Sequence, residues 1–159
     1  MKINKVAITS KFGSKESEKA ANGVVKKLLK LKSQVYTVAP ISVQGAKKID
    51  ALEELKKIKL DLVITLGGDG TTLRTFRNLE NETPVLAINA GGNRGILSEI
   101  SLDEFDKAIQ CIKKNQIWLD KRTRVVASCN GKQFQPALNE IYVNRKNLTK
   151  TADFEIKFQ

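Results

Sequence analysis

The residues best suited to chemistry are a carboxylate and its flanking glycines, placed directly after an apolar run. Asp69 lies among Gly67, Gly68 and Gly70, and residues 62–66 before it are apolar apart from one threonine. Glycines let a backbone approach phosphate oxygens closely, and the N–H groups of a helix start point at the anion. The Asp69 carboxylate could accept the proton of an attacking hydroxyl or help to hold Mg²⁺ on the phosphates. We therefore predict phosphoryl transfer at this turn, with a plain glycine-rich turn as the alternative.

Other chemistries are disfavoured by what the chain lacks. Histidine is absent, so acid–base work must fall to carboxylates, lysines, tyrosines or backbone groups, and most zinc sites are excluded. No Gly-x-x-x-x-Gly-Lys-Ser/Thr run exists, which excludes a Walker A loop. A dinucleotide fingerprint would require glycine at Leu73 and an acidic residue about 20 positions later, and neither is present.

A second glycine cluster follows the next apolar run, over residues 88–97. It contains Asn89 and Arg94 among several glycines. Ligands of parallel sheets bind at the carboxyl ends of strands, where this cluster is expected to lie. Arg94 could offer a charged fork to a phosphate or carboxylate. The alternative is a loop whose glycines serve only turns.

The elements that must position these residues alternate between strands and helices. This alternation predicts right-handed βαβ units and a parallel sheet, and therefore an α/β fold class. Ser101 to Glu104 has the form of a capping box and is expected to open the last helix. We expect strands over 2–8, 34–38, 61–66 and 84–88, and helices over 14–32, 49–58, 71–79 and 101–115.

The pattern changes after Trp118. Residues 125–136 predict a hairpin, because Asn130-Gly131 suits a type I′ turn, and further strands are expected over 138–143 and 153–158. We therefore expect an α/β nucleotide-binding domain over 1–118 and the start of an incomplete all-β domain over 119–159. A few strands alone make a poor core, so this part should pair with other strands or with another subunit.

Composition restricts the protein class further. The chain has 159 residues, is 41% hydrophobic and 28% charged, and has a formal charge of +11, which is a globular composition with a basic surface. The lysine pairs are spread along expected helices without interleaved aromatics, so we expect solvated faces and no specific nucleic-acid partner. No apolar run approaches the roughly 20 residues needed to span a bilayer, no signal peptide is evident, and Cys111 and Cys129 fit buried small residues. We expect a cytoplasmic protein without a membrane partner.

Three segments together resemble the NAD kinase family, across essentially the whole chain. They are Gly67-Gly68-Asp69-Gly70-Thr71-Thr72-Leu73-Arg74, the stretch from Ile88 to Glu99, and Leu138-Asn139-Glu140-Ile141. The first motif is shared with diacylglycerol and sphingosine kinases and, more distantly, with 6-phosphofructokinases. The Asn139-Glu140 pair, close to a basic stretch at 121–124, narrows the resemblance to NAD kinases.

The resemblance implies an NAD kinase/diacylglycerol kinase-like nucleotide-binding domain that transfers the γ-phosphate of ATP to the adenosine-ribose 2′-hydroxyl of NAD, with a divalent metal such as Mg²⁺. It implies that Asp69 is the catalytic general base, and that the enzyme is a homo-oligomer. It implies no metal ligand set in the protein itself. The nucleotide-binding residues that it implies are Gly67, Gly68, Gly70, Thr71, Arg74, Asn89, Asn139 and Glu140.

Two departures separate the chain from the family pattern. One extra residue lies between Asn89 and Gly95, and Ile96 stands where the family usually has phenylalanine. Family members also continue beyond the position of Gln159, through a region that completes the NAD site, so the chain resembles a truncated member. Two alternatives stay open, namely a lipid kinase of the diacylglycerol type and a non-catalytic nucleotide-binding module.

Overall fold

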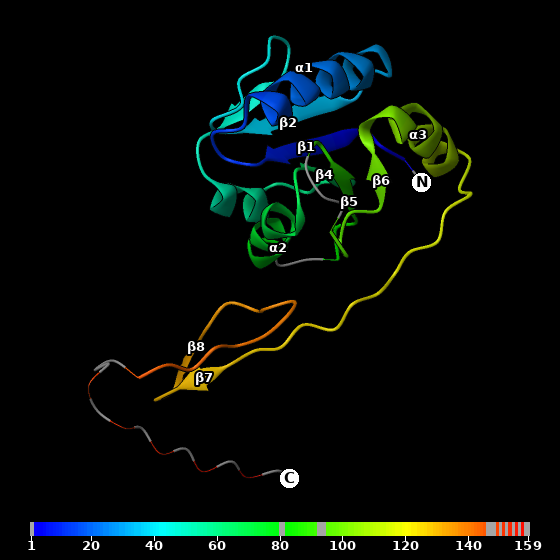
Figure 1. The fold of residues 1–159 in the computed structure, drawn as a ribbon. Helices are drawn as coiled ribbons and strands as arrows, with labels where there is room; N and C mark the ends of the chain where they lie inside the picture. Colours follow the sequence, from blue (N-terminus) through cyan, green and yellow to red (C-terminus); the bar gives the residue numbers. More distant parts are fainter. Residues whose placement is uncertain are drawn as a thin grey trace.

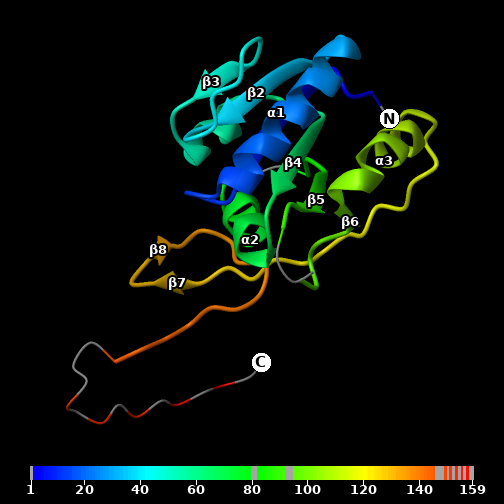
Figure 2. The same cartoon turned by 45° about the horizontal axis from the view of Figure 1, so that its top comes forward.

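The chain forms a parallel sheet of six strands in the order β3-β2-β1-β4-β5-β6. The computed structural model describes residues 2–79, 82–91 and 95–145, together with 149, 151, 153, 155 and 157. Figure 2 shows the sheet running from β3 at one edge to β6 at the other. The strands are β1 (Lys5–Ser10), β2 (Gln34–Val38), β3 (Lys47–Ile49), β4 (Leu62–Leu66), β5 (Val85–Asn89) and β6 (Ile100–Ser101). The expected α/β fold class is confirmed.

Helices cover both faces of the sheet. Helices α1 (Lys15–Lys30) and α3 (Phe105–Lys113) pack on one face, and α2 (Asp69–Arg77) lies on the other (Figure 1). Neighbouring residues of a strand point to opposite faces, so Ile8 joins the core under α1 and α3 while Ala7 joins the core on the other face. The central strands are therefore buried on both sides, as their nearly continuous apolar sequence predicts.

Helix α1 begins where the sequence provides a cap. The Ser14 side chain accepts a hydrogen bond from the Ser17 N–H at 3.2 Å, which satisfies one of the free donors of the first turn. Ala20, Val24 and Leu28 are buried against the sheet. Their spacing of four residues places them on one side of the helix, and this apolar stripe is the pattern that predicted a helix over 14–32.

The expected helix over 49–58 is wrong. Residues Lys47–Ile49 instead form the edge strand β3, which pairs with β2 in parallel, and a 3₁₀ helix, η1 (Leu52–Lys57), follows. The apolar residues of this stretch recur every third position, from Ile49 to Ile58. That spacing matches the three residues per turn of a 3₁₀ helix better than the 3.6 of an α-helix. The short strand β6 was not predicted either, and a 3₁₀ turn, η2 (Leu102–Glu104), separates it from α3.

The hairpin expected after Trp118 is confirmed in a shortened form. Strands β7 (Ser128–Cys129) and β8 (Lys132–Gln133) pair antiparallel, and Asn130 and Gly131 between them have φ values of 50° and 75°, as a type I′ turn requires. The strand expected over 138–143 does not form. These residues are largely exposed and pair with no other described strand. The strand expected over 153–158 falls partly on residues outside the described set.

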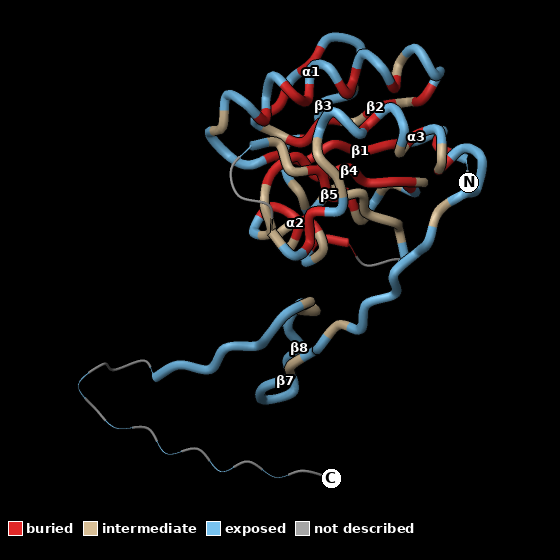
Figure 3. The backbone as a smooth tube through the Cα atoms, turned by 45° about the vertical axis from the view of Figure 1, so that its right-hand side comes forward, coloured by how far each residue is buried: buried red, intermediate tan, exposed pale blue. Residues whose placement is uncertain are grey.

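Most of the segment after α3 is exposed, in contrast to the sheet and its helices (Figure 3). Large apolar side chains are among the exposed ones, including Trp118 at 93% and Tyr142 at 81%. Both cysteines are free thiols; Cys111 is half-buried and Cys129 exposed, so neither is the buried residue that was expected. Among the described residues, no helix is both long enough and apolar enough to cross a bilayer.

Candidate functional site

The turn after β4 is built so that only glycine fits its first position. The Gly67 N–H donates to the Ile88 carbonyl at 3.0 Å, which ties the turn to the next strand of the sheet. A Cβ on Gly67 would lie 2.6 Å from Thr71 Oγ1 and 3.3 Å from the Lys11 Cβ. The chain therefore turns from the sheet into α2 within two residues, and Asp69 becomes the first residue of the helix.

The N-terminal end of α2 presents backbone donors without a side-chain cap. Its N-cap is Gly68, whose carbonyl accepts the N–H groups of Thr71 and Thr72 at 3.0 and 3.3 Å. Gly70 is exposed. The N–H groups at the start of an α-helix have no partner in the helix itself and carry a partial positive charge. This geometry suits a phosphate group, as the sequence predicted.

Buried threonines seat α2 on the sheet. Thr72 Oγ1 lies 3.0 Å from Thr65 Oγ1 on β4, and Thr75 Oγ1 lies 2.8 Å from Thr9 Oγ1 on β1. Thr75 also donates to the Thr71 carbonyl at 3.0 Å. Sequence reasoning missed this network, although threonines at spacings of three and four on one helix were a visible signal.

The two glycine clusters meet at Asp69. The backbone N–H groups of Ile96 and Leu97 donate to Asp69 Oδ2 and Oδ1, each at 3.0 Å. A Cβ on Gly95 would overlap the Asp69 carboxylate, so this approach requires glycine. The extra residue in the second cluster therefore does not remove Gly95 from the site. Arg94 lies outside the described residues.

Asn89 ends strand β5, near the start of the same loop. It is half-buried, and its Oδ1 accepts the Gly91 N–H at 3.2 Å. The carboxyl ends of parallel strands meet at one edge of the sheet, so β4 and β5 both end at the edge where Asp69 lies. Asn89 thus lies where the sequence placed it, at the edge used by ligands.

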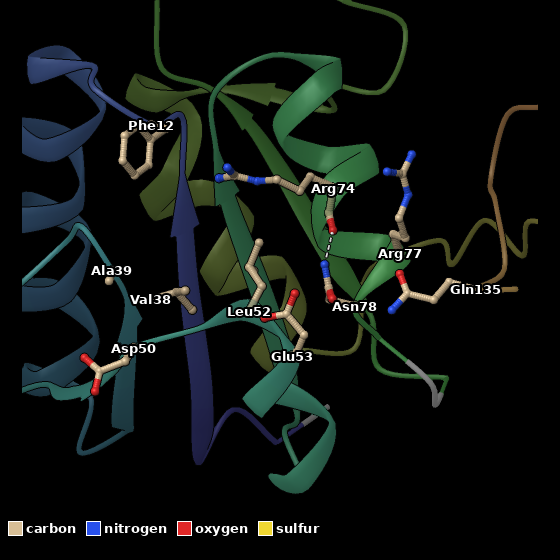
Figure 4. Close-up of a pocket in the computed structure, with 10 residues that line it drawn as sticks. All are labelled: Phe12, Val38, Ala39, Asp50, Leu52, Glu53, Arg74, Arg77, Asn78 and Gln135. Atoms are coloured by element: carbon tan, nitrogen blue, oxygen red, sulfur yellow. Dashed lines mark hydrogen bonds between the residues drawn. The ribbon is translucent and has the colours of Figure 1, made fainter. Parts of the chain in front are cut away.

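Arg74 faces a cavity of about 450 Å³ on the α2 side of the sheet. Its Nη2 donates to the Ser10 carbonyl at 2.9 Å, and its buried Nε has no hydrogen-bond partner in the described structure. Figure 4 shows its side chain extending from α2 toward Phe12 at the other side of the cavity. The remaining lining residues are Val38, Ala39, Asp50, Leu52, Glu53, Arg77, Asn78 and Gln135.

The segment after α3 reaches this part of the molecule through Gln135, which the sequence did not single out, and through Arg124 of the basic stretch at 121–124. Gln135 lines the cavity. Arg124 donates from Nη1 to the carbonyls of Phe76 and Leu79, at 3.2 and 2.6 Å. A guanidinium at the C-terminal end of a helix both satisfies free carbonyls and complements the helix dipole.

Asn139 and Glu140 are not joined to the turn. Both are exposed, and no hydrogen bond links either of them to Asp69 or its glycines within the part of the chain that is described. The structure therefore brings together the turn, Arg74 and the loop that begins at Asn89, and leaves this pair apart.

The carboxylate at the turn, Asp69, fits a metal ion that binds together with a nucleotide. No group of three or more acidic, histidine or cysteine side chains gathers within the described ranges. Mg²⁺ often binds through one or two carboxylates and the substrate's own phosphates, keeping water in the remaining positions. Asp69 lies at a helix start that suits a phosphate group, so its carboxylate fits such an ion better than a resident one.

Together these features define a doubly wound α/β domain of the nucleotide-binding type, with an uncapped start of α2 that suits a phosphate group and with the Asp69 carboxylate at that start. The chain belongs to the NAD kinase family, because the family of the ATP-NAD kinase N-terminal domain matches residues 4–117.

Two similar curated proteins are named as NAD kinases. A bifunctional NADP phosphatase/NAD kinase of Methanococcus maripaludis is 31% identical over an alignment of 166 residues, covering 98% of this chain and 29% of that protein. An NAD kinase of Methanothermobacter thermautotrophicus is 26% identical over 153 residues, covering 96% of this chain and 53% of its own length. The chain thus spans about half or less of the length of these curated relatives.

Two solved structures share the fold. An NAD kinase from Archaeoglobus fulgidus in complex with ATP matches with a TM-score of 0.63 and 24% identity, over 92% of this chain and 50% of that one. Yeast NADH kinase complexed with NADH matches with a TM-score of 0.67 and 21% identity, over 85% and 46% of the two chains. At these identities the likeness concerns the fold alone, and it confirms the expected NAD kinase-like architecture.

Proposed function

We propose that this chain is the nucleotide-binding part of an ATP-dependent NAD kinase, which transfers the γ-phosphate of ATP to the adenosine-ribose 2′-hydroxyl of NAD and produces NADP. One observation carries the proposal: the Asp69 carboxylate lies at the uncapped start of α2, where the two glycine clusters meet. Membership of the NAD kinase family selects the substrates among those that such a site could serve.

Asp69 acts as the general base in this proposal. The attacking hydroxyl loses its proton to the carboxylate as its oxygen bonds to the γ-phosphorus, and the bond from that phosphorus to the ADP oxygen breaks. The N–H groups of Gly68 and Gly70 bind phosphate oxygens, Gly67 permits the turn, and Thr71 supports it. A magnesium ion held by the phosphates of ATP would neutralise part of their charge.

Arg74 serves the phosphate donor. Its buried Nε lacks a partner among the described residues, and an unpaired buried donor costs free energy that a ligand oxygen would recover. The cavity beside it, at about 450 Å³, has the size of a small-molecule pocket. We place the nucleotide of ATP there, and NAD on the side of Asn89, Asn139 and Glu140.

We further propose a division into an α/β domain over 1–118 and the start of a β domain over 119–159, in a cytoplasmic homo-oligomer without a membrane partner. The exposed apolar side chains after α3, such as Trp118, Phe134 and Tyr142, support an interface there. Analytical ultracentrifugation tests it: Tyr142→Lys should weaken self-association, and a monomer at all concentrations for the unchanged chain would contradict it.

The activity is tested by measuring NADP formation from ATP and NAD with the unchanged chain and with Asp69→Asn. Loss of a general base lowers rates by about 10²- to 10⁴-fold, so kcat should fall at least a hundredfold while ATP affinity changes little. Asp106→Asn is the matched control, because its exposed ion pair joins α3 to Lys27 on α1, on the face of the sheet opposite to α2. Near-normal kcat in Asp69→Asn would remove Asp69 from the chemistry.

A second candidate is a nucleotide-binding module without catalysis. The exposed position of Asn139 and Glu140, unconnected to the turn, favours it, because an incompletely assembled acceptor site orients NAD poorly. ATP binding by calorimetry without NADP formation would select this candidate. Phosphorylation of diacylglycerol in vesicles, with no turnover of NAD, would instead select the lipid kinase alternative.

A further inference from the structure

The contact between the second glycine cluster and Asp69 has a specific geometry. Each carboxylate oxygen accepts one backbone N–H, Oδ2 from Ile96 and Oδ1 from Leu97, both at 3.0 Å. The two donors are consecutive along the backbone, so they grip the carboxylate from one side and fix the orientation of its plane. A carboxylate has about four acceptor positions, so both oxygens keep capacity for a further proton or ligand.

Gly95 makes this grip sterically possible. The position of its missing Cβ coincides with the Asp69 carboxyl group. Its neighbour Ile96 is 90% exposed, so this part of the loop is not held in place by burial of the isoleucine side chain. What requires glycine here is therefore the approach of the backbone to Asp69.

The donors themselves are anchored to the sheet. Leu97 is buried, and the Glu99 N–H donates to the Ala87 carbonyl on β5 at 3.0 Å. Strand β6 then pairs with the end of β5. The N–H groups that hold Asp69 thus belong to backbone fixed two residues later by the sheet. Backbone donors have no rotamers to lose, which makes them suitable for holding a reacting group in place.

We propose that the N–H groups of Ile96 and Leu97 form a clamp that positions Asp69. Gly95 is then a positioning residue of the reaction, because only glycine at this position lets the backbone approach the carboxylate. This inference rests on the proposed role of Asp69 as general base. It gives the second glycine cluster a function on the base itself, in addition to the ligand contacts expected of Asn89. Misplacing a reacting group by about 1 Å can cost on the order of 10²-fold in rate.

The test follows the amide signals of Ile96 and Leu97 in the ¹⁵N-labelled whole chain while the pH is lowered through the range of carboxyl titration. Both amides should shift with one common midpoint in the unchanged chain, and both transitions should vanish in Asp69→Asn, which keeps the shape of the side chain. In Gly95→Ala the transitions should also vanish, and hydrogen exchange of the two amides should accelerate at least tenfold. Gly23→Ala is the control, because nothing lies within 4 Å of the added Cβ.

Kinetics on the same proteins separate positioning from structure. Gly95→Ala should lower kcat for NADP formation at least tenfold and leave the KM for ATP within threefold of normal. The clamp is refuted if the two amides do not titrate together in the unchanged chain, which needs no variant to fold, or if they still titrate in Gly95→Ala. Lost titration with normal kcat refutes the positioning role. Absence of NADP formation by the unchanged chain, with the common titration intact, refutes the proposed function and not the geometry of the clamp.

Discussion

The hydrogen bond between Thr9 and Thr75 has a defined donor. This direction predicts that valine substitutions at the two positions lower the free energy of unfolding by unequal amounts. Thr75 Oγ1 donates its only proton to the Thr71 carbonyl, since a carbonyl can only accept. The contact at 2.8 Å between the two side chains therefore has Thr9 as the donor. Both side chains are buried, at 1% and 0% exposure, so water cannot replace a lost partner.

Thr75→Val should cost more than Thr9→Val. The first change leaves the buried Thr9 hydroxyl without an acceptor, for a cost of about 1–3 kcal/mol, whereas the second removes one hydrogen bond of about 0.5–1.5 kcal/mol and leaves Thr75 bonded to the helix. The double variant should be less destabilised than the sum by about 1 kcal/mol, because neither hydroxyl then remains. Valine and threonine have similar helix propensities, so the comparison is not confounded.

Urea unfolding followed by circular dichroism measures these differences, provided that the m-value stays constant. Thr37→Val is the matched control: the Thr37 hydroxyl is buried and has no partner among the described residues, so the same change there should be neutral or stabilising. A Thr9→Val cost equal to or larger than that of Thr75→Val would refute the assigned direction, and strict additivity would refute the contact.

Three further predictions test other parts of the framework by the same unfolding measurement. Arg124→Met removes both hydrogen bonds at the end of α2 and should cost about 1–2 kcal/mol, whereas Arg122→Met, whose partner is an exposed carboxylate, should cost less than about 0.5 kcal/mol; equal costs would argue against the cap. Gly23→Ala should stabilise α1 by about 0.5–1 kcal/mol, and Gly13→Ala, at φ 69°, should destabilise by about 1–2 kcal/mol; the same sign for both would be contrary to expectation. Gly67→Ala should cost about 1–3 kcal/mol, and a neutral result would show that the turn yields easily.

The elements nearest to Asp69 could be predicted because their signals are local. The apolar run of β4, the glycines and the following helix are adjacent in sequence, and this layout has few structural solutions. The Asn130-Gly131 turn is likewise encoded within a few residues. In each case one short segment contains both the chemical group and its partner.

Features that depend on contacts between distant segments could not be predicted in the same way. The approach of Gly95 to Asp69 spans 26 positions, and the cap that Arg124 provides spans more than 40. The stretch 47–58 was misassigned for a related reason, since Lys47 and Lys48 pair with β2 only once the sheet exists. Placement of Asn139 and Glu140 in the site stays a prediction, because the strand expected to carry them does not form.

The same long-range contacts determine how firmly Asp69 is held. Its helix is fixed to β5 at the turn through Gly67, to β1 in the middle through Thr75, and to the segment after α3 at its end through Arg124. The carboxylate is then gripped by backbone from a fourth segment, at Ile96. The general base that we propose must keep its geometry while charge moves through the site, and rigid support from several segments provides this better than a single loop.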